Sequence, residues 1–211
     1  MPRTKGSANK ETVARKARLL DAVWKAMRAG GGKPLSWREM AGAAAVGPAT
    51  LAHHFGKRDA VVAAVLETRF AEGTGPLHRL ATPSSDDVGR CLADALDHML
   101  DGLLDFDVGG VVSVGLAESL HHDTLGPLFV EGGLEPILRA LARRLEAHVE
   151  AGTLSGGIDT RATALMLAAP VILAYMHQHP LGGADAHPTD LRGLAGTVAR
   201  TVAAGLAVPD A

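Results

Sequence analysis

The chain of 211 residues is long enough to bury a sizeable core, as one large domain or two smaller ones. Hydrophobic residues make up 47% and aromatic residues only 3%, and β-branched runs are scarce, which favours an all-α protein over a β-sheet protein. The net charge of −2 hides an asymmetry: residues 1–60 hold 12 Lys and Arg against 4 Asp and Glu, whereas residues 61–211 hold 9 against 19. A basic first quarter is typical of phosphate binding, and the acidic remainder is not.

Two features favour the cytoplasm as the location of the protein. The single cysteine, Cys91, allows no internal disulfide, as is usual in a reducing compartment. The N-terminus is polar and basic, without the apolar run of a secretory signal peptide.

The first predicted helix spans residues 11–29 and follows a polar, basic tail, residues 1–10. Its apolar stripe follows the 3.6-residue period and consists of Val13, Ala17, Leu20, Trp24 and Met27. The glycines and proline of residues 30–34 end this helix. Most of its basic side chains lie off the apolar stripe, so they are predicted to face solvent or a charged partner.

Residues 36–58 predict two short helices joined by a tight turn. Ser36 and Glu39 have the spacing of a capping box at the start of the first helix. Pro48 suits the first position of the second helix, in which Leu51 and Phe55 face inward. That arrangement leaves small, polar and imidazole side chains on the outer face, as in a helix that enters a DNA major groove. A plain helical hairpin is the alternative, but it does not account for the coincident positive charge.

The next predicted helix runs from residue 58 or 59 to about residue 70, and residues 73–85 look like a joint rich in Gly, Pro, Thr and Ser. The domains expected are therefore a DNA-binding domain over 1–58, a connecting helix and linker over 59–85, and a second domain over 86–211. In this second domain we expect helices over 86–108, 111–120, 125–149, 159–177 and 189–206, with breaks at Gly109-Gly110 and near Gly132-Gly133.

Residues 162–176 carry no charge over 15 residues. This run is shorter than the roughly 20 residues that a membrane span needs, and it contains Pro170. It predicts a helix buried on most sides, either inside a monomer or in a subunit interface.

Residues 11–70 resemble the DNA-binding domain of the TetR family of transcriptional repressors. The resemblance is carried by Ala41, Val46, Thr50-Leu51, His54-Phe55 and Arg58-Asp59. It implies a helix-turn-helix fold and DNA contacts from Trp37, Arg38, Pro48, Ala49, Thr50, His53, His54, Lys57 and Arg58. Thr50 matches a phosphate-contacting threonine, and Arg58 replaces a phosphate-contacting lysine. Two positions depart from the family pattern: Ala52 replaces an aromatic residue, and Gly47 replaces a hydroxyl cap.

For the second domain the resemblance covers the order of segments more than the residues. It implies a homodimer that binds a palindromic double-stranded DNA operator and is released by a small, mainly apolar effector. The expected ligand-binding residues are Met99, Leu103, Phe106, Leu116, His121, Phe129, Leu138 and Tyr175. The expected dimer interface uses the last two helices, with Ala164, Leu167, Ala168, Val171, Val198 and Val202.

Other functions have weaker support in the sequence. The ten histidines form no HExxH pattern, and one cysteine cannot build a thiolate zinc cluster, so no metal site is predicted, although His121-His122-Asp123 and His177 with His179 stay open as ligands. Cys91 lies on an apolar helical line, which disfavours a redox switch. We find no catalytic constellation and expect no cofactor and no membrane partner. The alternatives to an effector-controlled repressor are a ligand-independent DNA-binding regulator and an enzyme with a helix-turn-helix-like segment.

Overall fold

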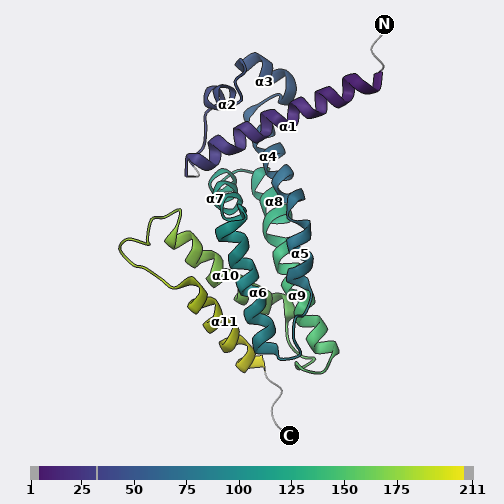
Figure 1. The fold of residues 1–211 in the computed structure, drawn as a ribbon, viewed down its shortest axis with the longest axis vertical. Coiled ribbons are helices and arrows are strands. Elements are labelled where there is room, and N and C mark those ends of the chain that lie inside the picture. The colour runs from purple at the N-terminus through teal and green to yellow at the C-terminus, as the bar shows by residue number, and fades with distance from the viewer. Residues whose placement is uncertain (1–4, 32, 207–211) are drawn as a thin grey trace. The chain divides into compact units, whose positions relative to one another are not determined.

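The computed structural model describes residues 5–31 and 33–206, and every regular element in these ranges is a helix, so the predicted all-α class is confirmed (Figure 1). The chain forms two compact units: unit 1 comprises Met1–Ala71 and Val114–Phe129, and unit 2 comprises Glu72–Ser113 and Val130–Ala211. These divisions differ from the boundaries expected at residues 58 and 85. The reason is that the helix after residue 58 packs its apolar side chains into the core of unit 1.

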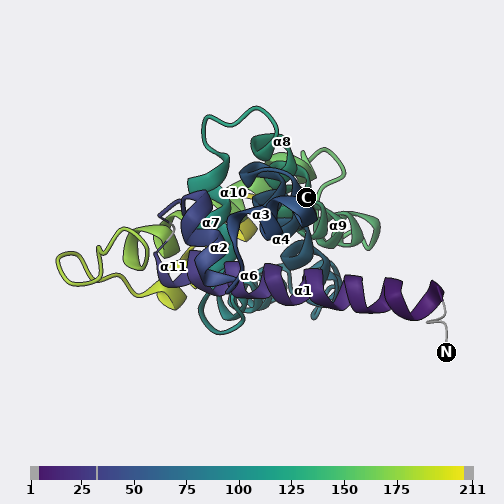
Figure 2. The same ribbon diagram turned by 90° about the horizontal axis from the view of Figure 1, so that it is seen from above.

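Unit 1 contains α1 (Lys5–Ala29), α2 (Trp37–Ala43), α3 (Pro48–Phe55), nearly all of α4 (Arg58–Glu72), the end of α7 (Val108–Ser119) and α8 (Leu125–Phe129). Its buried side chains are Leu19, Val23, Trp24 and Met27 of α1, Met40 and Ala41 of α2, Leu51 of α3, and Val61, Val62, Val65 and Leu66 of α4. The predicted stripe on α1 was therefore right for Trp24 and Met27, and Leu20 is half-buried, but it was wrong for Ala17 and Val13, which are exposed, Val13 by 62%. The reason is that α1 begins at Lys5 and its first half extends past the other helices of this unit (Figure 2).

Unit 2 contains α5 (Thr74–Ala81), α6 (Val88–Asp105), the start of α7, a π-helical turn (Val130–Leu134), α9 (Glu135–Glu150), α10 (Thr160–Gln178) and α11 (Leu191–Leu206). Helix α6 packs against α11 and α10, and α9 packs against α5 and α10. Asp87 and Asp159 cap α6 and α10 through side-chain hydrogen bonds to backbone N–H groups at 2.7 and 2.9 Å. No helix in the described ranges is long and apolar enough to cross a membrane.

Three predicted breaks in this unit are placed differently by the structure. Residues 74–81 of the predicted joint form α5, which contributes buried Leu80. Gly109 and Gly110 lie inside α7, and the chain turns instead at Asp107, whose φ is 65°. Gly132 and Gly133 form part of the π-helical turn rather than a break. A Cβ at Gly109 would overlap the Tyr175 hydroxyl, so close packing explains this glycine better than a turn.

Arg144 fastens α9 to α5 and α6 inside unit 2. Its side chain is buried and donates hydrogen bonds to the carbonyl oxygens of Leu80 at 2.8 Å, Arg79 at 2.9 Å and Cys91 at 3.0 Å. These contacts satisfy carbonyl groups at the end of α5 that have no partner within the helix. Cys91 is itself buried against this guanidinium, which agrees with a packing role for the thiol.

His148 is a buried imidazole one helical turn after Arg144, and we expect it to make stability depend on pH. The Thr153 hydroxyl donates to the carbonyl oxygen of His148, so ring Nδ1 must donate to that hydroxyl, 2.8 Å away. Nε2 is buried without a hydrogen-bond partner among the described residues. Burial and the positive charge of Arg144 lower the pKa of His148. The neutral ring therefore stabilises the fold above the unfolded-state pKa of about 6.5, and this contribution is lost as the pH falls from that value through the lower folded-state pKa.

Thermal unfolding of the wild type and His148→Asn at pH 7.5 and 5.5 measures this effect, because asparagine can donate to Thr153 but cannot titrate. We expect the wild type to lose more stability on acidification than His148→Asn. His98→Asn is the matched control and should keep the wild-type dependence. Equal losses in the wild type and His148→Asn would exclude His148 as the titrating group.

Candidate nucleic-acid interface

The helix-turn-helix is built by local signals that the sequence carries. The Ser36 hydroxyl accepts from the Glu39 N–H at 3.3 Å, and the Glu39 carboxylate accepts from the Ser36 N–H at 2.7 Å, so the predicted capping box is present. The hydrogen bonds to Ser36 lower the pKa of Glu39, which keeps the cap charged. Ala45 turns the chain with a φ of 52°, and Pro48 opens α3 at its first position.

The second helix of the helix-turn-helix, α3, separates a packing face from an outer face as predicted. Leu51 is fully buried, and Phe55 is half-buried with Lys16 of α1 over its ring at 5.7 Å. The expected DNA-contacting side chains differ in how far they are exposed to solvent. Pro48, Ala49, His53, Arg38 and Lys57 are exposed, and Trp37, Thr50 and His54 are half-buried. All of them therefore remain available for contacts with DNA.

Arg58 lies in a different environment from the one expected of a free phosphate-binding cation. Its Nη2 donates to both carboxylate oxygens of Glu118, at 2.7 and 2.8 Å, and its Nε donates to the Leu35 carbonyl oxygen at 2.7 Å. The Glu118 side chain is 3% exposed and that of Arg58 is 28% exposed. The arginine thus ties the start of α4 and the segment before α2 to the end of α7, all within unit 1.

A second contact lies beside this ion pair. His122 Nε2 is 3.4 Å from an Asp59 carboxylate oxygen. His122 Nδ1 accepts from the backbone N–H groups of Thr124 and Leu125, so the neutral ring carries its proton on Nε2, facing Asp59. Sequence reasoning missed Glu118 as a functional candidate, because its partner is 60 residues away and no local pattern connects them.

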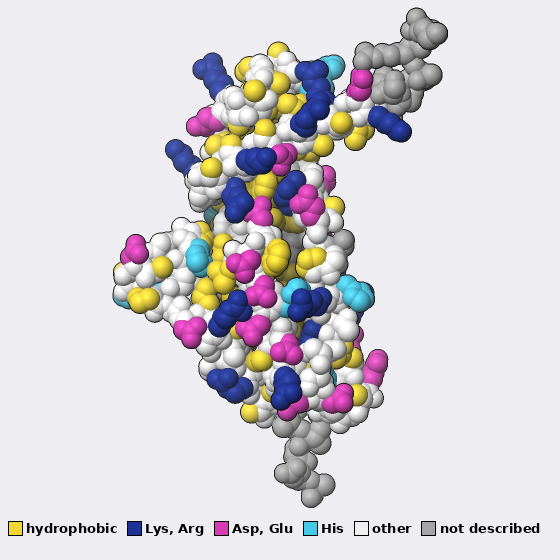
Figure 3. Space-filling model, viewed as in Figure 1, with side chains coloured by type: hydrophobic (Ala, Val, Ile, Leu, Met, Phe, Trp, Pro, Cys, Tyr) yellow, Lys and Arg dark blue, Asp and Glu magenta, His cyan; other side chains and the backbone are white. Residues whose placement is uncertain are grey.

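His54 lies in a positive field between α3 and α1. Its ring centroid is 5.4 Å from that of His53. Burial lowers the pKa of His54, and the charges of Arg15, His53 and Lys16 lower it further. Figure 3 shows dark-blue Lys and Arg side chains along α1 and over the helix-turn-helix. This surface has the electrostatic character that a DNA backbone requires.

The expected effector-binding residues fall into buried and exposed groups. Met99, Leu103 and Tyr175 are buried in unit 2, Phe129 is buried in unit 1, and Leu138 and Leu116 are half-buried. Phe106, however, is 72% exposed at the end of α6, and His121 is exposed with a φ of 64° in the turn after α7. Placing these two in an enclosed pocket was wrong, because both belong to turns between helices.

The expected dimer residues on α10 are also placed differently. Ala164, Leu167, Ala168 and Val171 are at most 1% exposed within the protomer, whereas Val198 and Val202 of α11 are half-buried. The exposed face of α10 is the opposite one, with Leu165, Met166 and Leu173 at 53%, 61% and 68% exposure, and Ala169 lies between them. Assigning the interface to the buried face was wrong, because those side chains form the protomer core and cannot reach a partner.

The comparisons with known proteins agree on the fold. A Mesorhizobium loti protein assigned to the TetR family of transcriptional regulators superposes with a TM-score of 0.72 at 16% identity, covering 93% of this chain and 98% of that one. The Stenotrophomonas maltophilia repressor SmeT in complex with triclosan gives 0.66 at 21% identity, covering 93% of both chains. The flavonoid-responsive regulator FrrA gives 0.65 at 22% identity, covering 94% and 99%. No family model and no curated protein matches the sequence. The chain therefore has the fold of TetR-family regulators.

Proposed function

We propose that the protein is a homodimeric DNA-binding transcriptional regulator of the TetR type, and a repressor released from a palindromic operator by a small, mainly apolar ligand. The observation that carries this proposal is the helix-turn-helix of unit 1, with His53 and Ala49 exposed on α3 and a basic surface around them. A helix of eight residues reads only a few base pairs, so a specific site needs two copies related by a two-fold axis.

The exposed apolar face of α10 supports the homodimer. Large apolar side chains in a contiguous stripe are rarely left in water on a soluble protein, and a second copy of the same face would cover them. Helix α11 packs beside α10 and presents small side chains to solvent, among them Thr197, Thr201 and Ala204, which permit close approach of a partner helix.

Effector control is proposed on the composition of the unit 2 core and on the SmeT–triclosan complex among the structural neighbours. Met99, Leu103 and Tyr175 are buried in unit 2 and combine apolar side chains with one hydroxyl, a composition that suits a weakly polar organic molecule. Release requires the ligand to bind more tightly to the conformation that does not fit the operator, so operator DNA must lower the affinity for the ligand by the same factor. A ligand-independent regulator is the alternative, and the cytoplasm is the proposed location.

Footprinting the full-length protein on the DNA around its own gene tests the function. We expect protection of a palindrome whose half-sites lie about one helical turn apart. His53→Ala should change the sequence preference if the imidazole reaches base edges, and Lys57→Ala should weaken binding to all sequences about equally. Absence of salt-dependent binding to any duplex would refute the proposal.

A further inference from the structure

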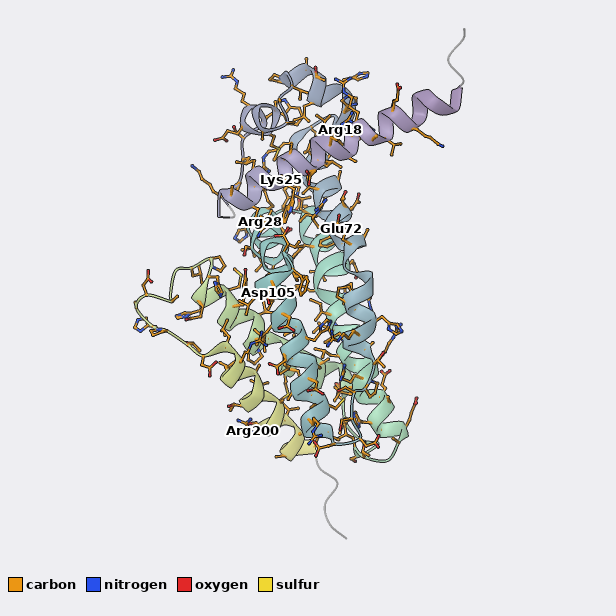
Figure 4. All side chains as sticks on the ribbon, viewed as in Figure 1. Arg18, Lys25, Arg28, Glu72, Asp105 and Arg200 are labelled. Atoms are coloured by element: carbon orange, nitrogen blue, oxygen red, sulfur yellow. The ribbon has the colours of Figure 1, made fainter. Side chains whose placement is uncertain are left out.

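The surface where α1 passes α3 contains a hollow that places residues of α1 beside His54, one of the expected DNA contacts. It has a volume of about 570 Å³ and is lined by Glu11, Thr12, Ala14, Arg15, Arg18 and His54. All six residues belong to unit 1, and His54 comes from the recognition helix. Because Arg15 and Arg18 are three residues apart on α1, their side chains lie on the same face of the helix and reach the same hollow. Arg18 is labelled on α1 in Figure 4.

The two arginines that line this hollow outnumber its one carboxylate, that of Glu11. Neither Arg15 nor Arg18 makes an ion pair or hydrogen bond with any residue in the described ranges, and both are exposed. Lys25, farther along α1, is by contrast paired with Asp21 at 2.8 Å. Two guanidinium groups that line the same hollow as a half-buried imidazole form a site for an anion with several acceptor oxygens.

We propose that Arg15, Arg18 and His54 form a phosphate-binding site for the DNA backbone next to the half-site that α3 reads. This inference rests on the proposed function and adds a second contact region on α1. The ligand is a backbone phosphate and not a free anion, because the hollow is open and lies beside the recognition helix. The two arginines supply the charge, and His54 links the site to the helix that contacts the bases.

The start of α1 at Lys5 contributes to this proposed site. Helix α1 spans 25 residues from Lys5, so Arg15 and Arg18 lie near its middle. The helix therefore fixes their backbone positions before DNA arrives, which reduces the entropic cost of binding. A phosphate here fixes the register of α3 on the duplex without reading sequence.

The test compares the wild type with Arg15→Gln/Arg18→Gln. Affinity is measured for the footprinted operator and for an unrelated duplex of equal length, at several salt concentrations from about 50 to 200 mM. We expect the slope of log K against log salt to become shallower by about 0.9 for each phosphate that the variant no longer neutralises. Affinity for both duplexes should fall by a similar factor, tenfold or more at the lowest salt, so the preference for the operator is kept.

Arg143→Gln is the matched control, because Arg143 is an exposed arginine of unit 2. It should leave the salt slope unchanged. An unchanged slope in Arg15→Gln/Arg18→Gln, or an equal decrease in affinity in Arg143→Gln, would overturn the phosphate site while leaving the function intact. If the wild type shows no salt-dependent DNA binding at all, the proposed function itself fails. Far-UV circular dichroism checks that the variants fold.

The imidazole gives an independent measurement. Burial lowers the pKa of His54 and the neighbouring charges lower it further; a bound phosphate opposes the effect of those charges, so DNA binding should take up a proton and become tighter as the pH falls from 7.5 to 5.5. In the free protein the charges of Arg15, Lys16 and His53 act on this ring, and Arg18 and the Glu11 carboxylate line the same hollow. His54→Gln should bind DNA with a weaker dependence on pH. The same dependence in His54→Gln and the wild type would remove His54 from the site.

Discussion

Replacing Arg58 with alanine is expected to lower the free energy of unfolding by about 2–4 kcal/mol. The carboxylate of Glu118, 3% exposed, would stay buried without the two hydrogen bonds from Nη2. Breaking a buried ion pair by removal of one partner costs about 3–5 kcal/mol, and the partial exposure of Arg58 reduces the figure here. Chemical denaturation of the wild type and Arg58→Ala measures this difference.

Two further variants separate this structural role from a phosphate contact. Arg58→Lys keeps the charge but cannot donate to both Glu118 oxygens and to the Leu35 carbonyl oxygen in the same geometry, so it should lose stability and DNA affinity together. Glu118→Gln keeps the shape and leaves Arg58 free for phosphate. If Arg58 acts only on phosphate, Arg58→Lys will bind DNA like the wild type and Glu118→Gln will bind more tightly.

The double variant Arg58→Ala/Glu118→Ala completes a double-mutant cycle, which measures the interaction energy between the two side chains. With both charged groups removed, no carboxylate remains buried without a partner, so the double variant should be more stable than Arg58→Ala alone. Additive effects would mean that the two residues do not interact energetically. Asp59→Asn is a control for the neighbouring contact with His122, which is more exposed and should have a smaller effect.

If the protein forms the proposed dimer, replacing Leu173 with aspartate is expected to leave a folded monomer and to abolish binding to the proposed operator. Leu173 is 68% exposed on the outer face of α10, so a charge there is tolerated by the protomer. In a dimer it would be buried against apolar side chains, which should raise the dissociation constant by about 100-fold or more. Light scattering at micromolar concentration and operator binding measure the two effects.

A substitution on the buried face of α10 should have a different effect from Leu173→Asp. Leu167 is fully buried in the protomer, so Leu167→Asp should unfold unit 2 instead of yielding a folded monomer. Leu104→Asp, at an exposed position on α6, should leave the assembly unchanged. A monomeric wild type that still binds the operator would contradict the dimer, and a dimeric Leu173→Asp would move its interface away from this face.

Local hydrogen bonds explain what the sequence determined by itself. The capping box of Ser36 and Glu39 and the caps by Asp87 and Asp159 each join groups three residues apart, and Pro48 starts α3 through its fixed backbone angle. Such contacts form in the same way wherever the segment lies in the fold. The helix-turn-helix and the all-α class were therefore readable from the residues.

Only the tertiary structure decided which partner or face a side chain uses. Helix α10 is apolar all round, so its periodicity cannot tell the core face of Leu167 from the solvent face of Leu173, and the prediction chose the wrong one. In the sequence, Gly109 is equally compatible with a turn and with close packing. The structure decides for close packing, because the Tyr175 side chain occupies the space that a Cβ would need. Arg58 has a carboxylate partner 60 residues away, and the energy of that pair depends on burial, which no local pattern of residues contains.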